Sequence, residues 1–345
     1  MPPALASFGT PVAVAGIAKE LKKLWQADQT RTRASLINFA IICEGEAAMQ
    51  ESTELLSRFV GNHAFRALLI GIDPGAAETS VQAWVNANCY LPKAGAKHVC
   101  CEQVSIFVRG NVRELLPNLI FSQLDYDLAL TLWWRCECPD QINPEVWRWV
   151  DRLIFDSRAW TEPRRQLAAM RDATRGSRTV LCDLNWMRTL YLRQSLAQIF
   201  DAPEALAELR RLHRVSIVHA PGARSTAILL LGWFSAQLEW TAHGPGGDRL
   251  TFAADARSIA CELAEAAGAS ISRVLLESDR LQVCAEHQPQ RDYLNLTLRW
   301  KDGRTSAHVL PGDSDDLADI LDEELASGGR HSVYLNALAA AESLL

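Results

Sequence analysis

The sequence predicts an α/β protein whose N-terminal sheet is covered by helices and is followed by a second, α+β domain with an antiparallel sheet. Strands and helices alternate through the first half, as in layered α/β folds. The apolar run LINFAIIC, residues 36–43, is short, β-branched and unbroken, which is typical of a strand buried on both faces. After HGPGGD, residues 243–248, strand-like segments follow one another between turn residues, which favours an antiparallel sheet.

The elements of the first half follow from hydrophobic periodicity and from the position of proline and glycine. Gly61 marks a helix end, Pro144 and Pro163 mark helix starts, and Pro117 predicts a short or kinked helix. The predicted helices cover residues 17–27, 47–61, 111–124, 143–153 and 161–176. The predicted strands cover residues 36–43, 64–73, 79–91, 98–110, 127–138 and 152–157.

The second half begins with a predicted strand, residues 179–184, that passes directly into a long helix ending near residue 202. Three domain segments are expected: an N-terminal arm and helix (1–30), an α/β domain (31–177) and an α+β domain (178–345). Further helices are predicted at 203–212, 223–240, 314–329 and 331–345, and strands at 214–220, 249–255, 271–278, 280–287, 292–300 and 305–311.

Composition excludes several classes of protein. The formal charge of −6 is spread over 345 residues, so no basic face for nucleic acid is expected. The N-terminus lacks the pattern of a secretory signal, and the apolar stretches are too short to span a membrane. We therefore expect a cytoplasmic protein, with no nucleic-acid or membrane partner, whose nine cysteines are mostly reduced.

No catalytic signature is present. The sequence has no dinucleotide fingerprint, no phosphate loop, no His-Glu-x-x-His and no Gly-x-Ser-x-Gly elbow. We therefore predict no catalytic residues, no cofactor and no metal. One alternative stays open, a sugar-phosphate-binding protein or enzyme that holds phosphate with Arg66, Arg109 or the turn RGNVRE at residues 109–114.

The stretch HVCCEQ, residues 98–103, raises a second alternative, a redox or zinc protein. Strand alternation sends Cys100 inward and Cys101 to a more polar face, which makes Cys101 the candidate redox thiol. Paired strands would bring Cys43 or Cys138 near it. A zinc site would draw on His98, Cys100 and Cys101 with the pair Cys136 and Cys138, but this spacing matches no zinc knuckle. Packing in a strand is the simpler interpretation.

Tryptophans crowd into residues 133–149, where four of them lie. Trp and Arg dominate protein interfaces, so the cluster favours a partner surface, although each tryptophan singly is more typical of a core.

Five segments taken in order resemble the OpcA family, the glucose-6-phosphate dehydrogenase assembly proteins. They are TRTRASLINFAIIC (30–43), KHVCCEQVSIFVRG (97–110), LPNLIFSQLDYDLALTLWWR (116–135), DRLIFDS (151–157) and VLCDLNWMRTLYLRQSLAQIFD (180–201). In place of the family's Pro-Trp-Arg-like step, this chain has Tyr191, Leu192 and Arg193.

The resemblance implies a non-enzymatic allosteric activator. Such a protein binds glucose-6-phosphate dehydrogenase and favours its active oligomer, at the entry to the oxidative pentose phosphate pathway of carbohydrate metabolism. We expect the contacts to come from exposed tryptophan and arginine side chains around residues 133–135 and 186–193. The candidate contacts are Trp133, Trp134, Arg135, Trp186, Arg188 and Arg193.

Overall fold

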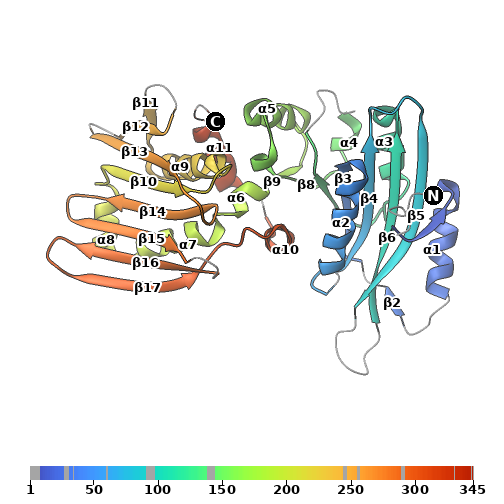
Figure 1. Cartoon of the computed structure of the whole chain (residues 1–345), viewed down its shortest axis with the longest axis horizontal. Helices are drawn as coiled ribbons and strands as arrows, with labels where there is room; N and C mark the ends of the chain where they lie inside the picture. Colours follow the sequence, from blue (N-terminus) through green and yellow to red (C-terminus); the bar gives the residue numbers. More distant parts are fainter. Residues whose placement is uncertain are drawn as a thin grey trace. The chain divides into compact units, whose positions relative to one another are not determined.

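The protein consists of two compact units, each built on its own sheet (Figure 1). The computed structural model describes residues 8–26, 31–33, 35–59, 61–90, 98–137, 144–243, 247–254, 257–288, 292–329, 331–342 and 344. The first unit comprises Met1–Phe155 and Arg165–Cys182, and the second comprises Asp156–Arg164 and Asp183–Leu345. Residues 156–164 lie before the boundary expected after residue 177 but belong to the second unit, and residues 178–182 lie after it but belong to the first. The boundary after residue 177 stays a proposal.

The first unit contains a nine-stranded sheet in the order β1-β5-β6-β4-β3-β7-β8-β9, with β2 pairing with β6. Strands β6, β4, β3, β7 and β8 are parallel. At one side β5 runs antiparallel to β6, and β1 runs antiparallel to β5. The strands are β1 (Thr10–Val12), β2 (Arg31–Arg33), β3 (Ile37–Glu44), β4 (Phe65–Asp73), β5 (Ser80–Tyr90), β6 (His98–Arg109), β7 (Leu130–Trp134), β8 (Arg152–Phe155) and β9 (Val180–Asp183).

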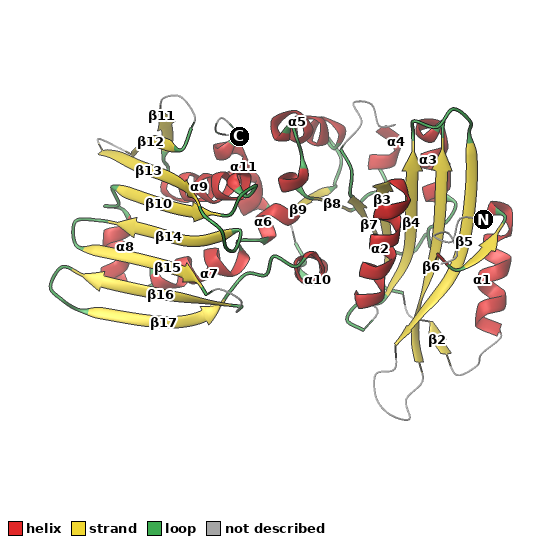
Figure 2. Ribbon diagram, in the orientation of Figure 1, coloured by secondary structure: helices red, strands yellow, loops and turns green. Residues whose placement is uncertain are grey.

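Helices cover both faces of this sheet, as the unbroken apolar strands predict. Figure 2 shows α2 and α3 on opposite faces. Gly71 on β4 permits the close approach of α2, because a Cβ at this position would lie 2.8 Å from Met49 Sδ. The helices are α1 (Ile17–Gln26), α2 (Gly45–Phe59), α3 (Val112–Phe121), α4 (Pro144–Trp147) and α5 (Pro163–Ala173), the last of which is shared by the two units.

The second unit contains an eight-stranded sheet in the order β11-β12-β13-β10-β14-β15-β16-β17. All pairs are antiparallel except β10 with β13, so the predicted antiparallel sheet is confirmed with one parallel exception. The strands are β10 (Arg214–His219), β11 (Thr241–His243), β12 (Arg249–Ala254), β13 (Arg257–Glu265), β14 (Ile271–Glu277), β15 (Leu281–His287), β16 (Tyr293–Trp300) and β17 (Thr305–Pro311).

Buried and half-exposed residues alternate along β14, β15 and β16, which is the period of a sheet with one covered face. The apolar helix α9 lies against β10 and β13. The helices of this unit are α6 (Leu184–Met187), α7 (Leu190–Ile199), α8 (Pro203–Leu209), α9 (Arg224–Leu238), α10 (Leu317–Ala326) and α11 (Ser332–Ala341), together with a 3₁₀ turn at Ser157–Ala159.

Three local expectations need correction. The helix predicted at residues 143–153 is formed only at Pro144–Trp147, because β8 begins at Arg152. The helix predicted to follow residue 184 without a break is divided into α6 and α7 at Arg188 and Thr189. Strands β1, β2, β11 and β13 were not predicted; the first three have only three residues each, which carry too little periodicity to detect.

Close packing of α9 on α11 depends on Gly232. A Cβ at this position would collide with the backbone oxygen of Ala337 and would lie 2.7 Å from Ala341 Cβ. We expect Gly232→Ala to destabilise the second unit by about 1–3 kcal/mol despite alanine's better helix propensity, because α11 must shift. Thermal denaturation measures this, with Gln237→Ala on the exposed side of α9 as the control. An unchanged melting temperature for Gly232→Ala would contradict this, because α11 would then shift without any loss of stability.

Candidate functional site

The candidate contacts in the first unit are not exposed. Trp133 and Trp134 on β7 are 2% and 1% exposed, because helices cover both faces of this strand. Arg135 follows them, with its guanidinium carbon 4.8 Å from the centre of the Trp133 ring. Its Nη1 donates to Ser52 Oγ at 2.5 Å on α2. The expectation that these side chains lie on the surface was wrong for both tryptophans, and Arg135 joins β7 to α2.

The candidate contacts in the second unit are also buried. Trp186 is 4% exposed, and the guanidinium carbon of Arg193 lies 3.4 Å from the centre of its ring. Burial lowers the pKa of Arg193 to about 9. Arg188 makes a bidentate pair with Asp156, with both distances at 2.8 Å. These three residues pack within the second unit, and a partner contact by any of the six candidates stays a prediction.

Cys101, the candidate redox thiol, is buried and is not on an accessible polar face. Its thiol lies 3.7 Å from the backbone oxygen of His63, and burial raises its pKa, which disfavours the reactive thiolate. The neighbouring Cys100 forms a disulfide with Cys89, its direct cross-strand partner on β5. Sequence reasoning missed this pair, although the two cysteines are 11 positions apart, on the consecutive strands predicted at residues 79–91 and 98–110.

The residues of the zinc alternative are only partly described. Cys138 and the side chain of His98 lie outside the described residues, and Cys100 is committed to the disulfide. Cys43, the other suggested partner of Cys101, is buried, and its thiol lies 3.7 Å from the backbone oxygen of Ile70.

The phosphate-holding candidates differ in their surroundings. Arg109 pairs with Glu46 at 2.9 Å and lies 3.9 Å from Asp73, so two carboxylates already face it. At the turn of residues 109–114, Asn111 Nδ2 donates to Glu114 Oε2 at 2.6 Å. The Glu114 carboxylate is thus held in the first turn of α3, where an anion would sit. Arg66 is the candidate that borders a cavity.

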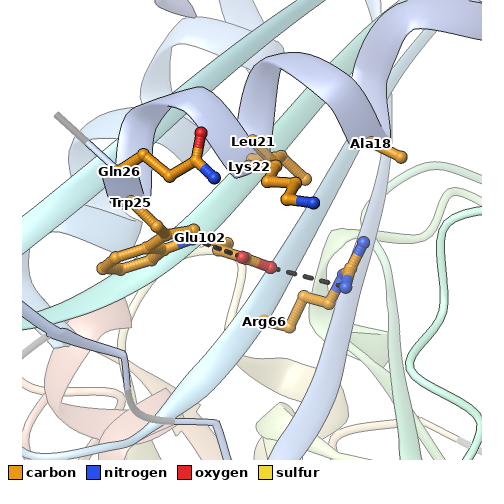
Figure 3. Close-up of a pocket in the computed structure, with 7 residues that line it drawn as sticks. All are labelled: Ala18, Leu21, Lys22, Trp25, Gln26, Arg66 and Glu102. Carbon is orange, nitrogen blue, oxygen red and sulfur yellow. Dashed lines mark hydrogen bonds and ion pairs between the residues drawn. The ribbon is translucent and has the colours of Figure 1, made fainter.

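This cavity of about 590 Å³ lies between α1 and strands β4 and β6 (Figure 3). Its lining residues are Ala18, Leu21, Lys22, Trp25, Gln26, Arg66 and Glu102. The Glu102 side chain is 3% exposed, and its carboxylate accepts a hydrogen bond of 2.6 Å from Trp25 Nε1. Arg66 Nη1 lies 3.4 Å from the other carboxylate oxygen. The site therefore holds a buried carboxylate between an indole and a guanidinium.

A second notable surface is the edge of the first sheet where β3, β7 and β8 begin. Leu36 directly precedes β3, while Tyr126 lies in the loop before β7 and Trp149 in the turn before β8; the three side chains are 75%, 85% and 60% exposed. These strands are parallel neighbours about 4.8 Å apart, so the segments that carry the three side chains lie at the same end of the sheet. We call them the exposed aromatic edge. Sequence reasoning noted Trp149 only as a cluster member and did not single out Leu36 or Tyr126.

Hydrogen bonds hold this edge in place. Asn38 Nδ2 donates to the backbone oxygens of Asp125 and Leu128 at 2.8 and 2.9 Å, which fixes the loop that carries Tyr126. Asp151 Oδ2 accepts from the backbone N–H of Leu130 at 2.8 Å, which ties the start of β8 to β7. The exposed aromatic edge is therefore pre-organised, a property that lowers the entropic cost of binding.

The second unit has a buried polar cluster around Asp183. Its Oδ2 accepts from Ser157 Oγ at 2.7 Å and Tyr334 Oη at 3.1 Å, and its Oδ1 accepts from the N–H groups of Ser157 and Asn185, both at 3.0 Å. Burial raises the pKa of Asp183 to about 6. Because Asp183 and Ser157 are 1% and 3% exposed, the cluster offers no access to a substrate and serves to join α6 and α11.

Comparison with known families identifies both units. The model described as "Glucose-6-phosphate dehydrogenase subunit N-terminal domain" matches residues 57–172, and the corresponding C-terminal domain model matches residues 179–338. No helix among the described residues is both long and apolar enough to span a membrane.

Two curated relatives carry the assigned name OxPP cycle protein OpcA. The protein of Nostoc punctiforme is 28% identical over 227 residues, which is 62% of this chain and 48% of the relative. That of Synechocystis sp. is 25% identical over 167 residues, which is 48% of this chain and 35% of the relative. The matched region thus spans half or less of each curated relative.

Two solved structures with weak similarity to this chain are assigned as oxidoreductases. The protein yhhX is 9% identical with a TM-score of 0.45, over 89% of this chain and 95% of that one. The protein yvaA from Bacillus subtilis is 9% identical with a TM-score of 0.47, over 91% and 95%. At this similarity they carry no argument about function.

Proposed function

The chain belongs to the OpcA family of glucose-6-phosphate dehydrogenase assembly proteins, and from this membership we propose that it binds glucose-6-phosphate dehydrogenase and favours the enzyme's active oligomer. The observation that carries the proposal is the match of the two family models to most of both units. The protein would act in the cytoplasm without catalysing a reaction of its own.

The physical mechanism is linkage. A protein that binds one oligomer of an enzyme more tightly than another shifts the equilibrium by that difference in binding free energy and by no more. Mixing the purified chain with its cognate dehydrogenase and measuring KM and oligomer mass tests this. A lower KM together with a heavier complex supports the proposal. Unchanged kinetics and no complex at micromolar concentrations contradict it.

We further propose that the exposed aromatic edge is part of the dehydrogenase contact. Large exposed aromatic side chains at one edge are the residues that most often carry binding energy in interfaces. Tyr126 and Trp149 lie inside the segment matched by the dehydrogenase-subunit N-terminal model. The buried candidates Trp133 and Trp134 would then support the edge from within the sheet.

The double variant Tyr126→Ala, Trp149→Ala is expected to weaken binding to the dehydrogenase about 30-fold or more, since two interface anchors are removed. Surface plasmon resonance with immobilised dehydrogenase measures the affinity, and circular dichroism verifies the fold. Val309→Ala in the second unit, where the side chain is 70% exposed, is the matched control. Equal affinities for the double variant and the control would exclude the exposed aromatic edge from the contact.

A further inference from the structure

We propose that the chain forms a weak two-fold dimer through the free edge of β17, where the β17 strand of a second copy extends the second sheet. β17 is the last strand in the order of this sheet, and Figure 2 shows it at the outer side of the sheet, next to β16. The contact involves only copies of this chain, so it goes beyond the dehydrogenase contact and does not depend on it.

β17 lacks the features by which proteins usually protect the edge of a sheet. Protected edges are short, or they carry charged residues, an internal proline or a bulge. The end strands β1, β9 and β11 have three or four residues each, whereas β17 has seven. Its sequence TSAHVLP contains no Lys, Arg, Asp or Glu, its only proline is the last residue, and its register with β16 is unbroken. A regular, uncharged edge of this length is suited to pairing with another strand.

Two hydrogen bonds that flank β17 show which of its backbone groups point away from the sheet. The N–H of Trp300 donates to the oxygen of Arg304 at 2.9 Å, and the N–H of Gly312 donates to the oxygen of Asp292 at 3.0 Å. Bonded and non-bonded pairs alternate in an antiparallel ladder, so the even-numbered residues of β17 bond to β16. The odd-numbered residues therefore direct their backbone groups outward. They are Thr305, Ala307, Val309 and Pro311, the last of which has no N–H.

A second β17 strand, antiparallel across a two-fold axis, supplies the matching groups. Each copy offers three outward N–H groups, so the pair can form up to six hydrogen bonds between the strands. A two-fold contact requires one surface to be complementary to itself. The β17 edge meets this requirement, because its side chains are uncharged and no like charges face one another. Arg304, at the start of the strand, is already paired with Glu204 and Asp302.

The helix side of this edge is also incompletely covered. A cavity of about 400 Å³ lies between β16 and β17 on one side and α7 and α8 on the other. Ser306, His308 and Leu310 of β17 line it, together with Ile199 and Ala205 from the helices. The even-numbered side chains of a second β17 strand would continue this row beside the cavity. Their apolar contacts would add to the hydrogen bonds between the backbones.

The size of the contact determines its strength. β17 is about 23 Å long at 3.3 Å per residue, and a sheet with one layer of helices is about 20 Å thick. Pairing would thus bury about 450 Å² per copy and about 900 Å² in total, which is typical of weak contacts. On the face opposite the helices, the 70% exposed side chain of Val309 adds apolar surface. We expect a dissociation constant on the order of 10 μM.

Sedimentation velocity of the purified chain, without dehydrogenase, tests the proposal between about 1 and 200 μM, a range that brackets the expected dissociation constant. The mass should rise with concentration from the monomer value of 38.2 kDa towards twice that value. A chain that stays monomeric at about 200 μM would overturn the proposal, since a specific contact of this size would then be too weak to form.

Variants at the exposed residue Ala307 locate the contact. Ala307→Lys brings two like charges together across the two-fold axis and should weaken association about tenfold or more. Ala307→Glu should do the same, and an equimolar mixture of the two variants should associate again because opposite charges then meet. Val309→Ala, which stays uncharged and keeps its backbone N–H, is the matched control and should dimerise nearly as the parent does.

A backbone variant tests the hydrogen bonds directly. Ala307→Pro removes one outward N–H from each copy, a change that an edge strand tolerates, and should also weaken association about tenfold or more. Circular dichroism verifies that each variant is folded. A dimer that persists unchanged in folded Ala307→Lys and Ala307→Pro would form through another surface and would contradict the proposal. A monomeric parent whose dehydrogenase affinity falls in Ala307→Lys would instead assign this edge to the enzyme.

Discussion

Replacing Trp133 with alanine is expected to lower the free energy of unfolding of the first unit by about 3–5 kcal/mol. The indole is 2% exposed on a central strand and carries the Arg135 guanidinium over one face. Truncation removes apolar burial, leaves a cavity between strand and helix, and frees a charged group that packs against the ring. Urea denaturation followed by circular dichroism measures the loss.

Trp149→Ala is the matched control, because this tryptophan lies 16 positions along the chain and is 60% exposed. Its stability loss should stay within about 1 kcal/mol, while its effect on dehydrogenase binding should be large. The two variants therefore separate packing from recognition. Similar stability losses for both would contradict the burial difference, and a binding loss confined to folded Trp133→Ala would restore Trp133 as a contact.

Replacing Asp183 with alanine is expected to cost the second unit about 3–5 kcal/mol, because several buried donors lose their acceptor at once. The groups that lose this acceptor are the Ser157 N–H and hydroxyl, the Asn185 N–H and the Tyr334 hydroxyl. Asp183→Asn keeps the shape and one acceptor oxygen, so it should cost less. Urea denaturation monitored on the second unit compares the free energies of unfolding of the parent, Asp183→Ala and Asp183→Asn.

The pH dependence gives a sharper test of the same site. Burial raises the pKa of Asp183 from 3.8 to about 6, so between these values the folded protein binds a proton that the unfolded chain has released. This contribution to stability is full below about pH 4 and is lost as the pH rises to about 6. Asp183→Asn has no such titration, so its stability deficit relative to the parent should shrink over this window. Parallel pH profiles would contradict a buried, protonated Asp183.

Local sequence patterns predicted the fold because strands and helices leave short-range signals. Residues 36–43 have the unbroken apolar composition of a doubly covered strand, and β3 occupies nearly the same positions. The expectations about which side chains are exposed were the least accurate. Cys101 alternates with Cys100 and shares its face with Gln103 and Ser105, which suggests a polar surface, yet all these residues are buried.

The site was predictable only in fragments. Arg66 was a reasonable choice because a charge near the start of a buried strand needs a partner. Its partner Glu102 and the indole of Trp25 lie far away in the sequence, with Trp25 and Glu102 separated by 77 positions. The exposed aromatic edge likewise depends on which strands become neighbours, and β3 and β7 are neighbours although three strands, β4, β5 and β6, lie between them in the chain.

The sequence by itself determined the alternation of elements, the order of the segments that mark the OpcA family and the absence of a recognisable catalytic motif. Only the tertiary structure decided that Trp133, Trp134 and Trp186 lie inside while Tyr126 and Trp149 lie outside, and that Arg66, Lys22 and Glu102 border one cavity. Periodicity shows which side chains share a face of a strand or helix. Whether that face is covered depends on contacts between segments far apart in the chain, and these arise only when the sheet assembles.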